Sequence, residues 1–139
     1  MNAALRHARL CYDHVAGELG VALTSRLVED GYIALGDESG EVTASGDEFL
    51  SSFGVDLASA RKRCRNYCKA YLDWTERRHH LAGAVGAALT KRLFDLGWIE
   101  RSARGRTLIV TSAGYQGLRQ ALSLDLRKPS PGQTDFQNM

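Results

Sequence analysis

The sequence predicts an α+β, mainly helical fold of two duplicated winged-helix-like lobes, each a helix, a β-hairpin and a helix, joined by a central helix. Two matches predict this duplication. Residues 14–33 (HVAGELGVALTSRLVEDGYI) and 80–99 (HLAGAVGAALTKRLFDLGWI) are identical at eleven of twenty positions. Residues 42–46 and 110–114 also match, and the shift grows from 66 to 68 residues between the two matches. A hairpin loop between them would absorb the two extra residues.

The first repeat spans residues 1–55. Its predicted elements are a helix over residues 3–30 with a break near residues 17–20, a hairpin over residues 32–43, and a short second helix. Apolar residues at helical spacing indicate the first helix, and Gly31 is suited to end it. A Gly-Asp-Glu-Ser-Gly turn between two short apolar stretches indicates the hairpin. Thr43 or Ser45 is expected to cap the second helix.

Residues 56–78 are predicted to form the connecting helix, because Asp56 is a suitable N-cap and apolar residues recur behind it at helical spacing. The second repeat spans residues 79–127. Its predicted elements are a helix over residues 81–96, a hairpin over residues 98–111 and a helix over residues 113–122. The tail, residues 128–139, lacks an apolar stripe and is predicted to be disordered.

Composition indicates a cytoplasmic protein without a membrane segment. The 139 residues are 44% hydrophobic and 24% charged, as in ordinary soluble globular proteins. No apolar run approaches the ~20 residues of a membrane helix, and charged residues interrupt the N-terminus, where a signal peptide would lie. Three cysteines, an odd number, fit reduced thiols in a cytoplasm.

The charges are distributed unevenly along the chain, although the net charge is only +2. Residues 1–60 hold three basic and ten acidic side chains, whereas residues 61–139 hold fifteen basic and six acidic ones. Such an asymmetry indicates either that the second lobe faces a polyanion or that the two lobes attract each other.

Two stretches resemble a known family. ALRHARLCYDHVAGELGVAL (residues 4–23) and LDWTERRHHLAGAVGAAL (residues 72–89), with the two Val-Thr-x-x-Gly helix starts, are similar to the C-terminal domain of a large subgroup of ArsR-like bacterial transcription regulators. The resemblance covers about residues 3–125. The chain departs from the family at Tyr71, where related sequences usually carry a cysteine, and this departure bears on any thiol-based sensing in the family.

The resemblance implies a repressor in which an N-terminal winged helix-turn-helix dimer binds operator DNA and the C-terminal domain senses or dimerises. That N-terminal domain is missing from this sequence, so DNA is expected to be bound through a separate or missing domain. The chain itself is predicted to be a regulatory domain that senses a small-molecule or anionic effector, forms a homodimer, or does both. We expect neither catalysis nor a cofactor, since the sequence holds no phosphate-binding glycine loop, HExxH helix or GxSxG elbow.

The alternative function is a nucleic-acid-binding winged-helix module that uses the basic second repeat. Its candidate DNA contacts are Arg101, Arg104 and Arg106, in a hairpin where the first repeat carries acidic residues. Arginines on a wing can follow the phosphate backbone or enter a minor groove. The helix before this hairpin is heavily apolar, however, and offers few side chains that could read bases.

The candidate effector-binding residues are Asp73, Trp74, Arg77 and Arg78, in a segment that differs from its counterpart in the first repeat. Tryptophan offers an apolar face, the carboxylate offers a polar contact, and the arginines could clamp an anion in bidentate fashion. The alternative interpretation is a solvated helix start around a packed tryptophan.

No metal site is predicted. Cys64 and Cys68 have the i, i+4 spacing that, with Cys11 as a third thiolate, could hold a soft metal or trivalent arsenic. They also lie in an apolar stripe, and free cysteines are commonly buried, so they are assigned to the core. His14 and His80 occupy equivalent positions in the repeat. A pH-sensing role stays open for them, but their presence in both copies favours a structural role.

Overall fold

The structure is a computed structural model that describes residues 1–37, 39–63, 66–73 and 75–129. The first half of the chain contains α1 (Ala3–His7), β1 (Arg9–Cys11), β2 (His14–Ala16), α2 (Gly17–Glu29), β3 (Ile33–Leu35), β4 (Gly40–Val42) and α3 (Ala44–Phe53). The second half contains α4 (Leu57–Lys62), β5 (Lys69–Leu72), β6 (His79–Ala82), α5 (Gly83–Asp95), β7 (Ile99–Arg101), β8 (Leu108–Val110) and α6 (Ser112–Leu122). Most of the predicted disordered tail, residues 130–139, lies outside the described residues.

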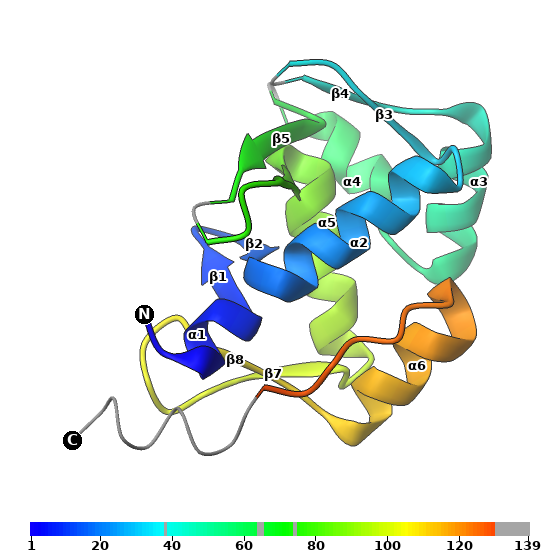
Figure 1. Ribbon diagram of the computed structural model, residues 1–139. Coiled ribbons are helices and arrows are strands. Elements are labelled where there is room, and N and C mark those ends of the chain that lie inside the picture. Colours follow the sequence, from blue (N-terminus) through cyan, green and yellow to red (C-terminus); the bar gives the residue numbers. More distant parts are fainter. Residues whose placement is uncertain (38, 64–65, 74, 130–139) are drawn as a thin grey trace.

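The described residues form six helices and four two-stranded antiparallel sheets, which confirms the predicted α+β class. Each repeat is a first hairpin (β1–β2 or β5–β6), a long helix (α2 or α5), a second hairpin (β3–β4 or β7–β8) and a final helix (α3 or α6), as Figure 1 shows. Within the described part of the chain, no helix is long and apolar enough to cross a membrane.

The second hairpins confirm the register predicted from the repeat. Ile33 pairs with Val42 in the first copy, and Ile99 pairs with Val110 in the second. The shift is therefore 66 residues on the first strand of the hairpin and 68 on the second. The two extra residues fall in the loop between β7 and β8.

The helix ends are set by the residues that the sequence singled out. Gly31 follows α2 with a φ of +77°, a left-handed conformation that favours glycine. The Thr43 hydroxyl accepts a hydrogen bond from the Gly46 amide (3.0 Å) and caps α3. Thr111 caps α6 in the same way, through the Gly114 amide at 3.0 Å.

The prediction of one helix over residues 3–30 is wrong, because a hairpin interrupts it. The chain turns at Tyr12, which has a φ of 61°, and Leu10 then pairs with Val15 across the β1–β2 ladder. Helix α2 begins only at Gly17, where a Cβ would lie 2.6 Å from the Arg6 carbonyl oxygen. The spacing of the apolar residues before Gly17 is compatible with a helix and with a strand. Pairing of β1 with β2 favours the strands.

The prediction of a connecting helix over residues 56–78 is also wrong. Asp56 does cap a helix, accepting from the Ser59 amide at 3.0 Å, but α4 ends at Lys62. Beyond it, Cys68 and Ala70 are buried while the residue between them is half-buried, which is the period-2 pattern of a strand. Pairing of β5 with β6 supplies the backbone hydrogen bonds that a longer helix would have made. For the same reason α5 begins at Gly83 rather than at residue 81.

The two repeats are interlocked. The second hairpin of the first repeat contacts β5, because the Gly40 amide donates to the Cys68 carbonyl (3.0 Å). The second hairpin of the second repeat contacts β1 in return, through the Leu10 amide and the Arg106 carbonyl (2.9 Å). Figure 1 shows these hairpins at opposite ends of the molecule, with β3–β4 beside β5 and β7–β8 beside α1.

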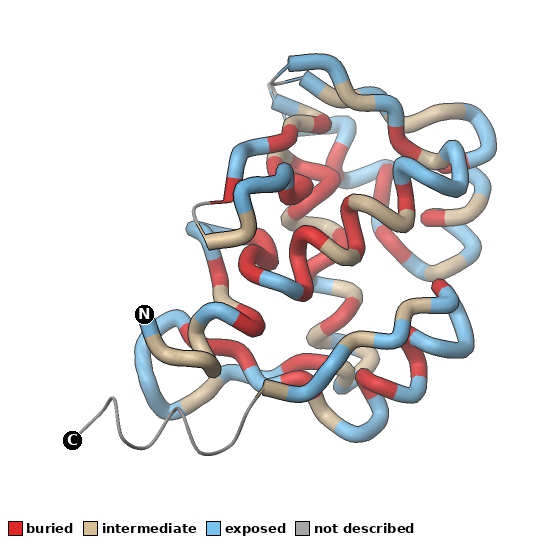
Figure 2. Tube along the Cα trace, viewed as in Figure 1, coloured by how far each residue is buried: buried red, intermediate tan, exposed pale blue. Residues whose placement is uncertain are grey.

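Both repeats contribute to one hydrophobic core. Its large and fully buried side chains include Leu19, Leu27, Leu50, Val85, Leu93 and Leu118. Figure 2 shows the buried positions gathered in the middle of the molecule, along α2 and α5, with the exposed positions around them. This shared core holds β2 and β6 side by side at the centre.

Candidate functional site

The two repeats meet along a pseudo-twofold axis between β2 and β6. The Val15 amide donates to the Thr90 hydroxyl oxygen (3.0 Å), and the equivalent Leu81 amide donates to the Thr24 hydroxyl oxygen (2.7 Å). Each threonine hydroxyl in turn donates to the carbonyl four residues before it, at 2.8 Å. These exchanged hydrogen bonds explain why a threonine stands at this position in both copies.

Two glycines allow the strands and helices to approach at this axis. A Cβ on Gly86 would lie 2.8 Å from the Leu81 carbonyl oxygen and 3.4 Å from the Cβ of His14. Gly20 is placed equivalently, against the Val15 carbonyl and the Cβ of His80. A side chain at either position would clash with the backbone carbonyl of the strand that carries a central histidine, whereas the histidine Cβ itself lies at an ordinary contact distance.

His14 and His80 meet at the axis itself. Their side chains are almost fully buried, and their Nε2 atoms lie 3.1 Å apart. The outer nitrogen of each ring faces a carboxylate: His80 Nδ1 lies 3.2 Å from Asp73 Oδ2, and His14 Nδ1 lies 3.2 Å from Asp13 Oδ1. The result is a row of four side chains, carboxylate–imidazole–imidazole–carboxylate, that runs across both repeats.

Asp73 is the most deeply embedded charge of this row, with no exposed surface. Its carboxylate accepts hydrogen bonds from the Gly17 amide (2.7 Å), the Thr75 hydroxyl (2.8 Å) and the Arg9 guanidinium (3.2 Å). Burial acts to raise the pKa of Asp73, but these hydrogen bonds and the positive charge of Arg9 outweigh it and hold that pKa well below its usual range. Asp73 is therefore ionised, and it ties the second repeat to the start of α2.

Both imidazoles are neutral at pH 7. Burial, followed by the proximity of His14, lowers the pKa of His80 to about 4, despite the opposing effect of Asp73. Burial also lowers the pKa of His14, with Asp13 acting in the opposite direction. Because an ionised carboxylate can only accept, the proton of the neutral His80 ring lies on Nδ1. Its Nε2 therefore presents a lone pair to His14.

Cys11 completes the arrangement around the axis. It lies opposite His14 in the β1–β2 ladder, just as Tyr71 lies opposite His80 in the β5–β6 ladder. The Cys11 sulfur and one ring nitrogen of each histidine all lie within 4.8 Å of one another. Cys11 is exposed, whereas both histidines are buried, so the cluster is open to solvent on the cysteine side.

The sequence is 38% identical over 122 residues to the Uncharacterized HTH-type transcriptional regulator YdfF of Bacillus subtilis (strain 168). The matched segment is 88% of this chain and 54% of that protein, so the chain spans about half the length of the curated relative it matches. A homologue of this chain is thus an HTH-type transcriptional regulator. No protein-family model matches the sequence, and no solved structure matches it significantly.

The structure separates the predicted effector-binding residues. Asp73 points into the core, whereas Arg77 and Arg78 are exposed, and the Arg78 guanidinium donates to the Ser25 hydroxyl (2.5 Å). Trp74 lies outside the described residues. Strand β5 ends at Leu72 and β6 begins at His79, so six residues separate these strands, whereas only two separate β1 from β2. The segment is therefore an insertion into a duplicated hairpin, and Asp73 is the part of it that reaches the axis.

The three wing arginines differ in their surroundings. The Arg106 guanidinium donates to the carbonyls of Leu10 (2.7 Å) and Tyr12 (2.6 Å), so it fastens the wing to the first hairpin. The Arg101 guanidinium lies 5.5 Å above the centre of the Phe94 ring. Arg104 is exposed at the loop.

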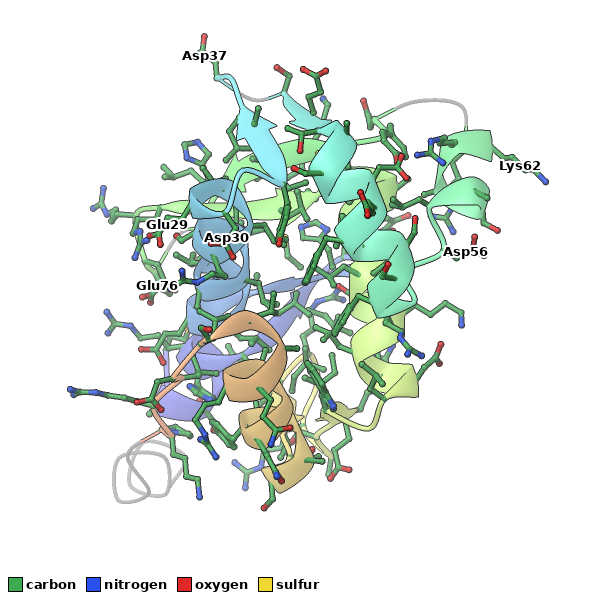
Figure 3. The ribbon with its side chains drawn as sticks, turned by 90° about the vertical axis from the view of Figure 1, so that its right-hand side faces the viewer. Glu29, Asp30, Asp37, Asp56, Lys62 and Glu76 are labelled. Atoms are coloured by element: carbon green, nitrogen blue, oxygen red, sulfur yellow. The ribbon has the colours of Figure 1, made fainter. Side chains whose placement is uncertain are left out.

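Three labelled acidic residues of the first repeat are exposed. Figure 3 shows Glu29 and Asp30 at the end of α2 and Asp37 at the tip of the β3–β4 hairpin, all on the outside of the molecule. The β3–β4 hairpin of the first repeat thus carries an exposed carboxylate, whereas the equivalent β7–β8 hairpin of the second repeat carries arginines and lies at the opposite end of the molecule.

The two described thiols lie in different surroundings. Cys68 is buried, and burial raises the pKa of its thiol to about 11, so it stays protonated at neutral pH. Cys64 lies outside the described residues. In the described ranges, Cys11 lies with His14 and His80. Sequence reasoning missed this group because His80 is far from the others in the chain, although Cys-x-x-His at residues 11–14 was a local signal.

Proposed function

We propose that this chain is the regulatory domain of an HTH-type transcriptional regulator, acting by effector sensing, by association, or by both, without catalysis. The similarity to YdfF over 122 residues carries the proposal, because it covers nearly the whole chain. DNA would then be bound by a domain or chain outside this sequence. Membership of an ArsR-like subgroup and action as a repressor are further parts of the proposal, supported by the resemblance of residues 4–23 and 72–89.

The geometry supports a regulatory domain, in which a ligand bound at the surface could affect both repeats. The interlocked hairpins and the shared core join the two repeats. They offer a contiguous path of contacts by which a shift of the residues at the axis could reach the β3–β4 and β7–β8 hairpins. A groove of about 580 Å³ runs between α4, α5 and the β1–β2 turn, and Asp13 and Tyr12 line it. An effector in this groove would contact the carboxylate that faces His14. The four-residue row at the axis is thus within reach of a ligand bound at the surface.

Direct DNA binding through the basic hairpin is the second candidate, favoured by the exposed Arg104 and by the excess of basic residues after position 60. The contacts of Arg106 and Arg101 with this chain disfavour it. Arg106 in particular would have to leave its two carbonyl partners before it could reach a phosphate.

The two candidates are distinguished by the affinity of the 139-residue chain for duplex DNA, measured by fluorescence anisotropy at physiological salt. A regulatory domain is expected to bind weakly, and the triple variant Arg101→Ala, Arg104→Ala, Arg106→Ala should behave like the parent. Micromolar or tighter binding that weakens steeply with salt and disappears in the triple variant would support the second candidate and overturn the first.

A further inference from the structure

The hydrogen bonds around the central imidazoles leave a lone pair at the axis. Asp73 fixes the proton of His80 on Nδ1, so Nε2 of that ring is an acceptor. His14 presents a second lone pair there in the tautomer that donates from Nδ1 to the Asp13 carboxylate, whereas its other tautomer donates from Nε2 to His80. In the first tautomer, two acceptor nitrogens face each other at 3.1 Å, and a cation against both would remove their repulsion.

The third side chain at this point is a metal ligand by its chemistry. In tetrahedral zinc sites the Zn–N distance is about 2.0–2.1 Å and the Zn–S distance about 2.3 Å, which places neighbouring ligand atoms about 3.3–3.6 Å apart. The two Nε2 atoms are already near this separation, and the three ligand atoms lie within 4.8 Å of one another. A rotation of the exposed Cys11 side chain would close the remaining gap.

We propose that Cys11, His14 and His80 form a binding site for a zinc-like divalent transition-metal ion on the pseudo-twofold axis. Two imidazoles and one thiolate are a donor set that suits Zn²⁺ and excludes Mg²⁺ and Ca²⁺, which require oxygen ligands. The inference concerns binding by this chain, and it stands whether or not the chain regulates transcription.

The surroundings match those of metal-binding histidines. Such histidines usually donate their second N–H to a carboxylate, which fixes the ring and its tautomer, and Asp73 and Asp13 hold these positions. Both imidazoles are buried, so packing holds their rings in place at the axis. The solvent-exposed Cys11 provides the path of entry.

A tetrahedral metal ion held by these three ligands would have one coordination position left. The duplication indicates that Tyr71 lies next to this position. Tyr71 occupies in the second hairpin the place that Cys11 occupies in the first, opposite the histidine. Its ring centre lies 6.3 Å from that of His14. A cysteine at position 71 would give the site two thiolates and two imidazoles in a symmetric arrangement. The metal therefore has three ligands from this chain and one position for water or an external ligand.

The test is a titration of the metal-free, fully reduced 139-residue chain with Co²⁺, followed by competition with Zn²⁺. We expect one equivalent to bind and a thiolate-to-cobalt charge-transfer band to appear. Cys11→Ser should abolish the band and weaken Zn²⁺ binding more than about 100-fold, since changes to outer-shell partners alone usually weaken binding about 10–100-fold. Cys11 is exposed, so the serine variant is expected to fold, which circular dichroism verifies.

Matched variants separate this site from other thiols and histidines. Cys64→Ser, Cys68→Ala and His79→Gln should keep the band, because these residues are not ligands in the proposed site. Tyr71→Cys should tighten Zn²⁺ binding by at least about tenfold, by supplying a fourth ligand.

Three outcomes would overturn the proposal. The first is no stoichiometric binding by the parent chain, which would leave a hydrogen bond from His14 Nε2 to His80 Nε2 at the axis. The second is binding that Cys11→Ser does not weaken. The third is loss of the band in Cys64→Ser or Cys68→Ala but not in Cys11→Ser, which would point to a different thiol site.

Discussion

The Nε2 atoms of His14 and His80 lie 3.1 Å apart across the pseudo-twofold axis of the duplicated fold. The residues are equivalent in the repeat, yet their surroundings differ. The carboxylate beside His80 belongs to a buried Asp73 in a loop that the first repeat lacks, whereas the one beside His14 belongs to a partly exposed Asp13. The insertion between β5 and β6 thus makes the surroundings of a symmetric centre asymmetric.

The exchanged threonine hydrogen bonds should contribute equally to stability. We expect Thr24→Val and Thr90→Val each to lower the free energy of unfolding by about 1–3 kcal/mol, because each leaves a buried amide without its acceptor. Urea denaturation measures this change. Ser52→Ala, at an exposed position of α3, is the control and should change stability by less than about 0.5 kcal/mol. A large difference between the two threonine variants would contradict the pseudo-symmetry.

Asp73 should be the charged residue whose replacement lowers the free energy of unfolding most. We expect Asp73→Asn to lower the free energy of unfolding by about 3–5 kcal/mol, since it leaves Arg9 without its buried partner and places an amide among hydrogen-bond donors. Asp37→Asn, at the exposed tip of the β3–β4 hairpin, is the matched control and should have little effect. Equal effects of the two variants would show that the Asp73 network does not form.

The stability of the metal-free chain should fall as the pH drops from about 6.5 to about 4. The pKa of His80 is lowered to about 4 in the folded chain from the usual 6.5, so between these values the unfolded chain binds more protons than the folded one. Protonation then favours unfolding, and full stability requires a pH above 6.5. Urea midpoints measured across this range in the presence of a chelator test the direction. Replacement of the exposed His79 by glutamine should leave the slope unchanged, whereas His80→Gln should reduce it.

The wing arginines should differ in their effect on stability. Arg106→Ala removes two hydrogen bonds to backbone carbonyls and should lower the free energy of unfolding by about 1 kcal/mol, because the guanidinium is partly solvated. Arg104→Ala, two residues away in the same loop, should be neutral. Thermal unfolding of the two variants makes the comparison, and the same midpoint for both would show that Arg106 does not fasten the wing.

The duplicated elements could be predicted from the sequence because their signals are local. Gly31 and Thr43 mark the end of α2 and the start of α3, and the equivalent residues Gly97 and Thr111 do so in the second copy. A capping hydrogen bond and a left-handed backbone conformation each depend only on residues that are close in the sequence. For the same reason Asp56 could be identified as an N-cap, even though the helix behind it is shorter than expected.

The first hairpin of each repeat could not be predicted in this way. Leu10 and Val15 are compatible with a helix face as well as with a strand pair, and the choice depends on packing against the other repeat. Cys68 accepts its backbone hydrogen bond from Gly40, a residue of the first repeat, so β5 depends on a contact that no local pattern reveals. The cluster of Cys11, His14 and His80 depends on both first hairpins, and it could be recognised only once these were placed.

The most direct test of the account is the protonation pattern of the two central imidazoles, read from the ¹⁵N shifts of His14 and His80 by NMR, with and without one equivalent of Zn²⁺. We predict that both rings carry their proton on Nδ1 in the zinc-bound chain, that both Nε2 shifts move on zinc addition, and that both move much less in Cys11→Ser at the same zinc concentration. A proton on Nε2 of His14 that donates to His80 and persists in the presence of zinc would contradict the account.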